Sequence, residues 1–222
     1  MKKQFVVIGL GRFGISIATA LTKAGNDVLC VDDSEEIVED IAPFVTHAVQ
    51  ADATDEKALK ALGISNFDTA VIAIGQDIQA SILITLLCKE AGVPQVLVKA
   101  KSEIHAKVLE KIGADKIVFP ERDMGIKVAH NLSSENIIDY IEVSPDYSMM
   151  EVGTIKKWIG KTLLELNFRQ KYKLSIIAIK NGKNKININP HAQDPIEAGD
   201  RIVVVGLNSD IRKLVEFISN NK

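Results

Sequence analysis

Short runs of apolar, often β-branched residues alternate with amphipathic stretches along the first half of the chain. The apolar runs cover 5–8, 27–31, 45–51, 70–74, 96–98 and 116–119, and helical spacing marks 13–24, 35–41, 56–62, 79–91 and 104–112. Apolar strands separated by helices are typical of a parallel sheet with crossover helices. Six such units predict an α/β fold with a Rossmann-like, doubly wound parallel sheet.

The pattern changes after residue 120. A helix is expected over 121–133, and the composition becomes more polar near 136–148. Further elements are expected at 158–168, 174–179, 186–188 and 201–205, with a polar turn at 180–183 and a last helix from Asn208. This part is too short for a substrate domain and predicts a small α+β module. We therefore expect a nucleotide-binding domain over 1–120, a crossover helix and linker over 121–143, and a C-terminal lobe over 144–222.

Composition and charge narrow the class of protein. The chain has 222 residues, 46% of them hydrophobic, which suffices for one large core and a second, smaller domain. Its net charge of -2 offers no basic stripe for nucleic acid. The longest nearly uncharged apolar run, 80–88, is far shorter than the roughly 20 residues of a membrane span. Because the N-terminus leads straight into a strand rather than a cleavable signal, we expect a cytoplasmic protein. Cys30 and Cys88 stand singly in apolar segments without metal-type spacing, so we expect two reduced core thiols.

The strongest local signal is the sequence Gly9-Leu10-Gly11-Arg12-Phe13-Gly14 between the first strand and the first helix. Such glycines allow a tight turn and the close approach of a phosphate to amides at a helix N-terminus. The second strand ends in Asp32 and Asp33, where a carboxylate can accept hydrogen bonds from both ribose hydroxyls. The pattern predicts an adenine nucleotide with an unphosphorylated ribose. The competing interpretation is a glycine turn that serves only helix–strand packing.

An enzyme would need a positioned acid or base in addition to this cleft. None of the four histidines, at 47, 105, 130 and 191, has an orienting carboxylate at a recognisable spacing. An NAD-dependent oxidoreductase is therefore the second hypothesis, behind a non-enzymatic nucleotide sensor. A redox-sensing transcription regulator is the third, and it would require a basic DNA-binding helix pair that neither end of the chain provides.

Five motifs in order carry a family resemblance over essentially the whole chain. They are 9–14, Gly75-Gln76-Asp77-Ile78-Gln79-Ala80-Ser81, Lys99-Ala100-Lys101, Ile112-Gly113-Ala114-Asp115 and Pro120-Glu121-Arg122-Asp123-Met124-Gly125. Together they resemble the KtrA/KtrC regulators of Ktr potassium transporters, which are related to TrkA and built from RCK domains. The resemblance implies a Rossmann-like RCK N-domain, a crossover helix and a C-terminal RCK lobe. It also implies homodimers assembled into an octameric ring that binds ATP, ADP or NAD(H). Such a ring docks at the cytoplasmic face of the membrane beneath a KtrB or KtrD channel subunit.

The resemblance also implies which residues bind the nucleotide. It assigns residues of the glycine loop to the phosphates, Asp32 to the ribose, and 52–54 with Lys99 to the adenosine side. Glu121 would help to hold a divalent cation at the terminal phosphate, although an acid in the first turn after Pro120 also suits the helix dipole. Ile15 replaces a glycine that many relatives have. The full expected set is Gly9, Gly11, Arg12, Phe13, Gly14, Asp32, Asp33, Asp52, Ala53, Thr54, Gly75, Lys99 and Glu121.

The C-terminal lobe resembles the module that binds cyclic di-AMP between two subunits of this family. Arg169 suits a phosphate, and the aliphatic residues suit adenine faces, but each aliphatic residue taken alone suits an ordinary core or dimer contact as well. Gln170 and Lys173 replace the alanine and glycine that are usual in the family. The expected set is Leu163, Leu164, Asn167, Phe168, Arg169, Ser175, Ile176, Pro190 and His191.

Overall fold

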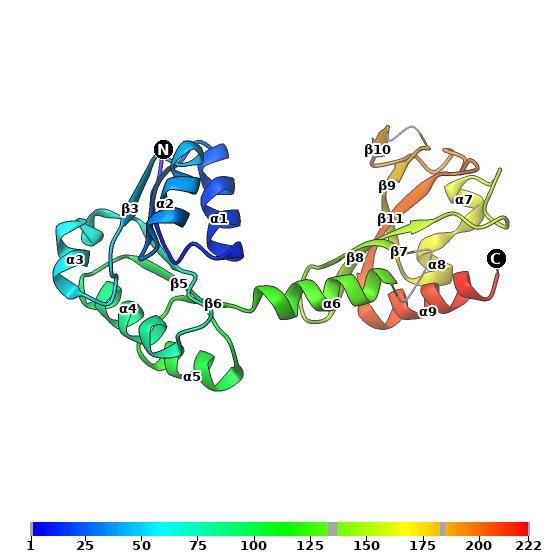
Figure 1. Cartoon of the computed structure of the whole chain (residues 1–222). Helices are drawn as coiled ribbons and strands as arrows, with labels where there is room; N and C mark the ends of the chain where they lie inside the picture. The colour runs from blue at the N-terminus through cyan, green and yellow to red at the C-terminus, as the bar shows by residue number, and fades with distance from the viewer. Residues whose placement is uncertain (1, 133–136, 183–184, 222) are drawn as a thin grey trace. The chain divides into compact units, whose positions relative to one another are not determined.

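The chain folds as two units, Met1–Glu121 and Arg122–Lys222. The computed structural model describes residues 2–132, 137–182 and 185–221. Helix α6 (Pro120–Leu132) begins in the first unit and continues into the second (Figure 1).

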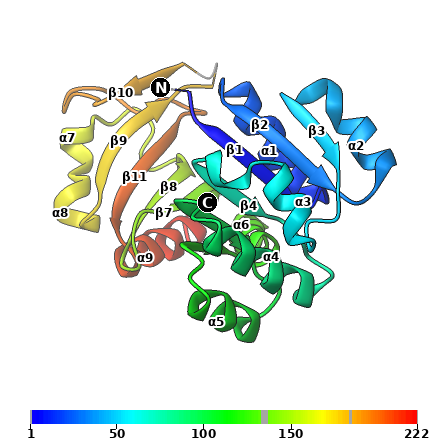
Figure 2. The same ribbon diagram turned by 90° about the vertical axis from the view of Figure 1, so that its left-hand side faces the viewer.

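Six parallel strands form the sheet of the first unit. They are β1 (Gln4–Ile8), β2 (Asp27–Asp32), β3 (His47–Gln50), β4 (Thr69–Ile72), β5 (Gln95–Lys99) and β6 (Lys116–Val118). Their order is β3-β2-β1-β4-β5-β6, so the chain crosses from one edge back to the centre between β3 and β4 (Figure 2). This order confirms the predicted doubly wound sheet. It puts the topological switch point, where such sheets bind ligands, between β1 and β4.

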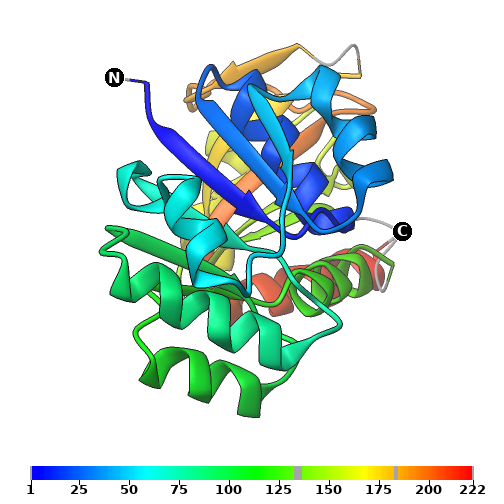
Figure 3. The same cartoon turned by 60° about the vertical axis from the view of Figure 1, so that its left-hand side comes forward.

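Helices cover both faces of this sheet. Figure 3 shows α1 (Arg12–Lys23) and α2 (Glu35–Ile41) on one face, with α3 (Glu56–Ala61), α4 (Ile78–Glu90) and α5 (Glu103–Lys111) on the other. Cys30 belongs to the core on the first face and Cys88 to the core on the second, so the sheet separates them. Both are free thiols, and burial raises the pKa of each to about 12.

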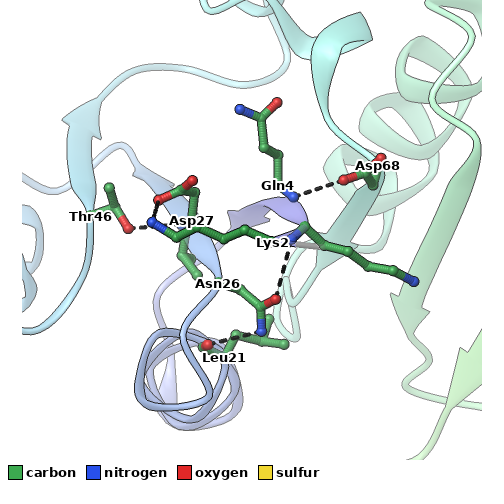
Figure 4. A network of polar contacts seen from close by, with 9 residues as sticks. Lys2, Gln4, Leu21, Asn26, Asp27, Thr46 and Asp68 are labelled. Carbon is green, nitrogen blue, oxygen red and sulfur yellow. Dashed lines mark hydrogen bonds and ion pairs between the residues drawn. The ribbon is translucent and has the colours of Figure 1, made fainter.

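Polar contacts hold the amino-terminal end of β1 in place (Figure 4). The Lys2 ammonium pairs with the Asp27 carboxylate at 2.6 Å, across to β2. The backbone N–H of Gln4 donates to Oδ2 of Asp68 at 2.8 Å, on the segment that leads into β4. The central strand is therefore anchored to both neighbours at the end opposite the switch-point crevice.

The second unit is a smaller α+β lobe. Its elements are β7 (Ile137–Glu142), β8 (Tyr147–Gly153), α7 (Leu163–Leu166), α8 (Phe168–Tyr172), β9 (Ser175–Lys180), β10 (Ile186–Ile188), β11 (Arg201–Leu207) and α9 (Asn208–Ser219). The antiparallel sheet has the order β10-β9-β11-β8-β7. Helices α8 and α9 pack against one face of this sheet around buried Trp158, Leu174 and Leu214. The lobe confirms the expected fold class.

Strands β7 and β8 were not predicted from the sequence. Strand β8 alternates between buried and less buried positions, but its first buried position is Ser148 rather than an apolar residue. The Ser148 hydroxyl donates to Oδ1 of Asn208 at 2.6 Å, which offsets the cost of burying it. The hydrophobic alternation that marks a half-buried strand is therefore broken in the sequence.

Candidate nucleotide-binding site

The three glycines of the first loop have different structural roles. Gly9 has a φ of 91°, and a Cβ there would lie 2.9 Å from Cγ1 of Ile74. A Cβ on Gly14 would lie 1.9 Å from the carbonyl oxygen of Gly9, so helix α1 can pack this close to the loop only with glycine. Gly11 has a φ of -69°, and apart from Gly11 itself and its two chain neighbours no described residue has an atom within 4 Å of the position that its Cβ would take. The fold thus requires glycine at 9 and 14 but not at 11, which lines the crevice at the switch point.

The N-terminus of α1 differs from those of helices α2 to α5. Ser34, Asp55, Asp77 and Ser102 each accept a backbone N–H at the start of α2, α3, α4 and α5. Within the described residues no side chain caps α1, and its first turn carries no acidic residue. The first amide donors of α1 are thereby left for an anion, and the helix dipole favours one there.

Asp32 ends β2 beside the glycine loop. Its Oδ2 accepts the backbone N–H of Leu10 at 2.6 Å, and its Oδ1 accepts that of Ser34 at 3.0 Å. Each carboxylate oxygen retains acceptor capacity, which a pair of ribose hydroxyls can use. Asp33 is exposed, and its carbonyl accepts from Nε2 of Gln50 at 3.0 Å.

The loop after β3 is preorganised by its own side chains. Oδ1 of Asp52 accepts both the hydroxyl of Thr54, at 2.6 Å, and the backbone N–H of Thr54, at 2.8 Å. These hydrogen bonds lower the pKa of Asp52. Ala53 is buried between them. The loop therefore presents an ionised carboxylate and backbone groups in a fixed conformation.

The loops after β1, β2, β3 and β4 enclose a cavity of ≈ 590 Å³ at the carboxyl ends of these strands. Its size falls within the roughly 300–1,000 Å³ of small-molecule sites. Eight of the expected nucleotide-binding residues line it: Gly9, Gly11, Asp32, Asp33, Asp52, Ala53, Thr54 and Gly75.

Five expected residues do not line the cavity. Arg12 is exposed at the start of α1, Phe13 is half-buried, and Gly14 is buried against the loop. Lys99 and Glu121 form an ion pair beside the cavity, in which the lysine side chain is 15% exposed and the glutamate side chain 72%. The hydrogen bond from Lys99 lowers the pKa of Glu121.

Gly75 connects this ion pair to the cavity. A Cβ on Gly75 would lie 3.3 Å from Nζ of Lys99, so the ammonium is seated against the loop that lines the cavity. Lys99 ends β5 and Glu121 lies in the first turn of α6. The pair therefore joins the switch-point loop to the helix that leads out of the first unit.

Of the lining residues that follow β4, sequence reasoning assigned only Gly75 to the site, although the motif 75–81 includes others. Asp77 and Ala80 lie at the start of α4, and Ile84 one turn further on. The signal for them is topological: the loop after the strand next to β1 faces the switch point in a doubly wound sheet. Asp77 also caps α4, accepting the N–H of Ala80 at 2.9 Å.

Most of the expected cyclic-dinucleotide residues form two groups, whereas Phe168 lies in the core of the lobe. The first group contains Arg169, Ser175 and Ile176. Nη2 of Arg169 donates to Oγ of Ser175 at 3.3 Å, and Ile176 follows on β9. Phe168 is only 5% exposed and packs in the core of the lobe, with its ring centroid 5.0 Å from that of Trp158.

The second group is joined by backbone contacts. Leu163 donates its N–H to the carbonyl of Asp194 at 3.1 Å, and Leu164 donates to that of Ala192 at 2.8 Å. These bonds bring the start of α7 beside the turn that contains Pro190 and His191. Leu164 is 66% exposed, and exposed Asn167, with a φ of 46°, separates α7 from α8.

Lys173 has a φ of 57°, in the left-handed region that favours glycine. The glycine usual in the family would suit this backbone conformation, and lysine there carries a small strain.

No group of three or more histidine, cysteine or acidic side chains that could hold a metal ion occurs among the described residues. In the same part of the chain, every helix is too short or too polar to cross a membrane.

Comparisons with known proteins extend over the whole chain. The TrkA-N domain model matches residues 5–120 and the TrkA-C domain model matches 150–219. The chain is 47% identical to Ktr system potassium uptake protein C of Bacillus subtilis (strain 168) over 222 residues, covering 100% of both chains. It is 48% identical to protein A of the same system and strain, covering 95% of both.

Among solved structures, the RCK domain of GsuK superposes with a TM-score of 0.68 at 17% identity, covering 98% of this chain and 48% of that one. The GsuK channel bound to NAD gives 0.52 at 21% identity, covering 100% and 39%. These likenesses show that the fold is that of an RCK domain.

Proposed function

The chain belongs to the family of Ktr and Trk potassium-uptake proteins that carry a TrkA-N and a TrkA-C domain, and from that premise we propose that it is a nucleotide-sensing regulatory subunit of a potassium-uptake channel. It works at the cytoplasmic face of the membrane as a homodimer that assembles into an octameric ring. Its partner there is a membrane-embedded subunit of the KtrB or KtrD type.

The observation that carries the proposal is the open space at Gly11. A loop that served packing alone would need glycine only where the backbone or a neighbour demands it, as at Gly9 and Gly14. At Gly11 the absence of a Cβ instead leaves room for a ligand beside the uncapped N-terminus of α1. That combination suits a phosphate-bearing ligand.

The ligand is ATP, ADP or NAD(H). Asp32 offers both carboxylate oxygens to a ribose diol, and the neighbouring Asp33 disfavours a 2′-phosphate. The GsuK channel, which has the same fold, has been solved bound to NAD, and this supports a dinucleotide as one possible ligand. With ATP, Glu121 helps to hold a divalent cation at the terminal phosphate.

The mechanism requires no chemical step. A nucleotide that binds one ring conformation better than another shifts the population by its differential affinity, and the ring transmits that bias to the channel subunit. The C-terminal lobe adds a second input, one cyclic di-AMP held between two chains by Arg169, Ser175 and the segments around Leu163 and His191.

The proposal is tested with Gly11→Ala in the full chain. We expect the thermal midpoint of unfolding to stay within a degree or two, because the position is open and its φ is allowed for alanine. Calorimetry should show ATP, ADP and NADH binding to the parent chain and much weaker binding to the variant. Gly14→Ala is the contrasting variant: its methyl group would clash with the carbonyl oxygen of Gly9, so we expect this protein not to fold.

The function is tested in cells that lack potassium uptake and express a KtrB-type subunit. The parent chain should restore growth of these cells at low potassium, and Gly11→Ala should change how potassium uptake depends on nucleotide. Equal nucleotide affinity in both proteins would refute the site. The second hypothesis, an NAD-dependent oxidoreductase, would be supported by substrate-dependent turnover of NADH by the purified chain.

A further inference from the structure

The segment that follows β10 is hydrogen-bonded on two sides. Toward α7, the N–H groups of Leu163 and Leu164 donate to the carbonyls of Asp194 and Ala192. An isolated bridge between Thr162 and Pro195 continues this pairing. The start of α7 and the segment 192–195 therefore form one short ladder in the second unit, where Figure 1 labels α7 and β10.

On the other side, the carboxylate of Asp194 holds the turn at 190–191. Its Oδ2 accepts the backbone N–H of His191 at 2.9 Å and Nδ2 of Asn187 on β10 at 2.9 Å. The backbone N–H of Asp194 donates to the carbonyl of His191 at 3.0 Å, which closes the turn. The residue is half-buried, so water competes only partly for these bonds.

Asp194 thus contacts both segments of the second group of candidate pocket residues, the start of α7 and the Pro190–His191 turn. Its carbonyl fixes Leu163, and its carboxylate fixes His191 relative to β10. None of the expected pocket residues makes both connections among the described contacts.

We propose that Asp194 is a positioning residue for the cyclic-dinucleotide pocket: it holds the Pro190–His191 turn against β10 in the conformation that the ligand contacts. This inference rests on the proposed binding of cyclic di-AMP in this lobe. The acidic side chain itself does not touch the ligand, because a carboxylate beside a phosphate would repel it.

The side chain and the backbone of Asp194 can be separated experimentally. Asp194→Ala removes both bonds made by Oδ2 and keeps the carbonyl that holds Leu163. The turn must then be ordered by the ligand itself, which lowers affinity. Asp194→Asn is the conservative variant, because one amide oxygen in the place of Oδ2 can accept both N–H groups.

The experiment is a calorimetric titration of the full chain with cyclic di-AMP. We expect Asp194→Ala to bind about tenfold more weakly, the size of loss that follows when a contacting turn is no longer preorganised. The ratio of ligand to chain should be unchanged. Asp194→Asn should bind within about threefold of the parent chain. Gln193→Ala, at the exposed neighbour, is the matched control and should bind normally.

ATP affinity is the second readout, since a general loss of folding would lower it too. It should be the same in all four proteins. If the parent chain binds cyclic di-AMP and Asp194→Ala binds it equally well, the positioning role is refuted while the pocket stands. Tighter binding by both variants would show that the carboxylate repels the ligand and would also refute the role. If the parent chain does not bind cyclic di-AMP, the pocket and the positioning role fall together.

Discussion

The backbone N–H of Leu10 donates a hydrogen bond of 2.6 Å to Oδ2 of Asp32. The bond links the glycine loop after β1 to the end of β2, in the wall of the crevice in which we propose that the nucleotide binds. It fixes the position of the carboxylate, and the bond from Ser34 to Oδ1 fixes its rotation. Asp32 therefore has a structural role as well as the proposed one, and a test of the site must separate the two.

Asp32→Ala should weaken every adenine nucleotide that has a free ribose diol. The loss should be roughly 10- to 100-fold, because a hydrogen bond to a charged group contributes about 1.5 to 3 kcal/mol. Isothermal titration with ATP, ADP and NADH measures it, and the thermal midpoint reports the separate cost of losing the Leu10 and Ser34 contacts. Asp40→Ala, exposed on α2, is the control. Parent protein that binds NADPH as tightly as NADH would refute the ribose assignment.

Arg12→Ala should weaken ATP more than ADP. Arg12 is exposed at the first position of α1 and does not line the cavity, so we expect its guanidinium to contact the outermost phosphate of a bound nucleotide or the ligand of a neighbouring chain. Calorimetry compares the two affinities. Lys23→Ala, in the last turn of the same helix, removes a charge of the same sign and should affect neither nucleotide. Equal losses for ATP and ADP would contradict the role.

Glu121→Gln should abolish the dependence of the ATP complex on a divalent cation. The Glu121 side chain is 72% exposed and can turn from Lys99 toward a cation at the terminal phosphate, whereas an amide keeps the shape without the charge. A thermal-shift titration with magnesium at saturating ATP gives the readout. Glu110→Gln, on α5, should retain the full magnesium response. A variant that still responds would leave Glu121 with only its place in the first turn of α6.

The fold was predictable because its strands are continuous apolar runs. The runs around Val7, Val71 and Val98 are buried on both faces, and no polar residue interrupts them. Strand β8 was not predictable in this way, since buried Ser148 has the wrong polarity and its partner, Asn208, is 60 residues away. Pairing over such a distance leaves no periodic signal in either segment.

The same reasoning applies to the site. Gly9, Gly11 and Asp32 were predictable because a local motif places them together, next to a strand end. Asp77 and Asp194 were not, because their positions depend on which loops the topology brings to one edge or which segments pair across a lobe. The Lys99 and Glu121 ion pair is intermediate: both residues were expected near the ligand from the family resemblance, but not in contact with each other.

Mild acid should destabilise the first unit through His105. The ring is 3% exposed, its Nδ1 accepts the backbone N–H of Lys101 at 3.3 Å, and its buried Nε2 has no partner among the described residues. Burial lowers the pKa of His105 below its usual 6.5. The stability contributed by the neutral ring is therefore fully present above about pH 6.5 and is lost as the pH falls through the folded-state pKa.

Chemical denaturation of the full chain between pH 7 and pH 5 measures this loss. Carboxylates such as Asp52, Asp115 and Glu121, whose pKa values are lowered, titrate below this window and do not contribute to it. His105→Gln should be less stable at pH 7 but should show a flatter dependence on pH. The same slope in both proteins would mean that another group is responsible.

Arg169→Ala should remove cyclic di-AMP binding and leave ATP binding intact. A ligand with two-fold symmetry suits an isologous interface, so one molecule should bind per two chains and the titration should saturate at half-occupancy. Each phosphate would take a charge-assisted hydrogen bond from one copy of Arg169, which in the free lobe donates to Ser175 at 3.3 Å. Losing both copies should cost roughly 3 to 6 kcal/mol of binding free energy, the sum of two bonds to charged groups. Calorimetry of the full chain gives stoichiometry and affinity together, and Lys171→Ala, two residues along α8, is the matched control. One site per chain, or unchanged affinity in the variant, would refute the assignment of Arg169 to a shared pocket.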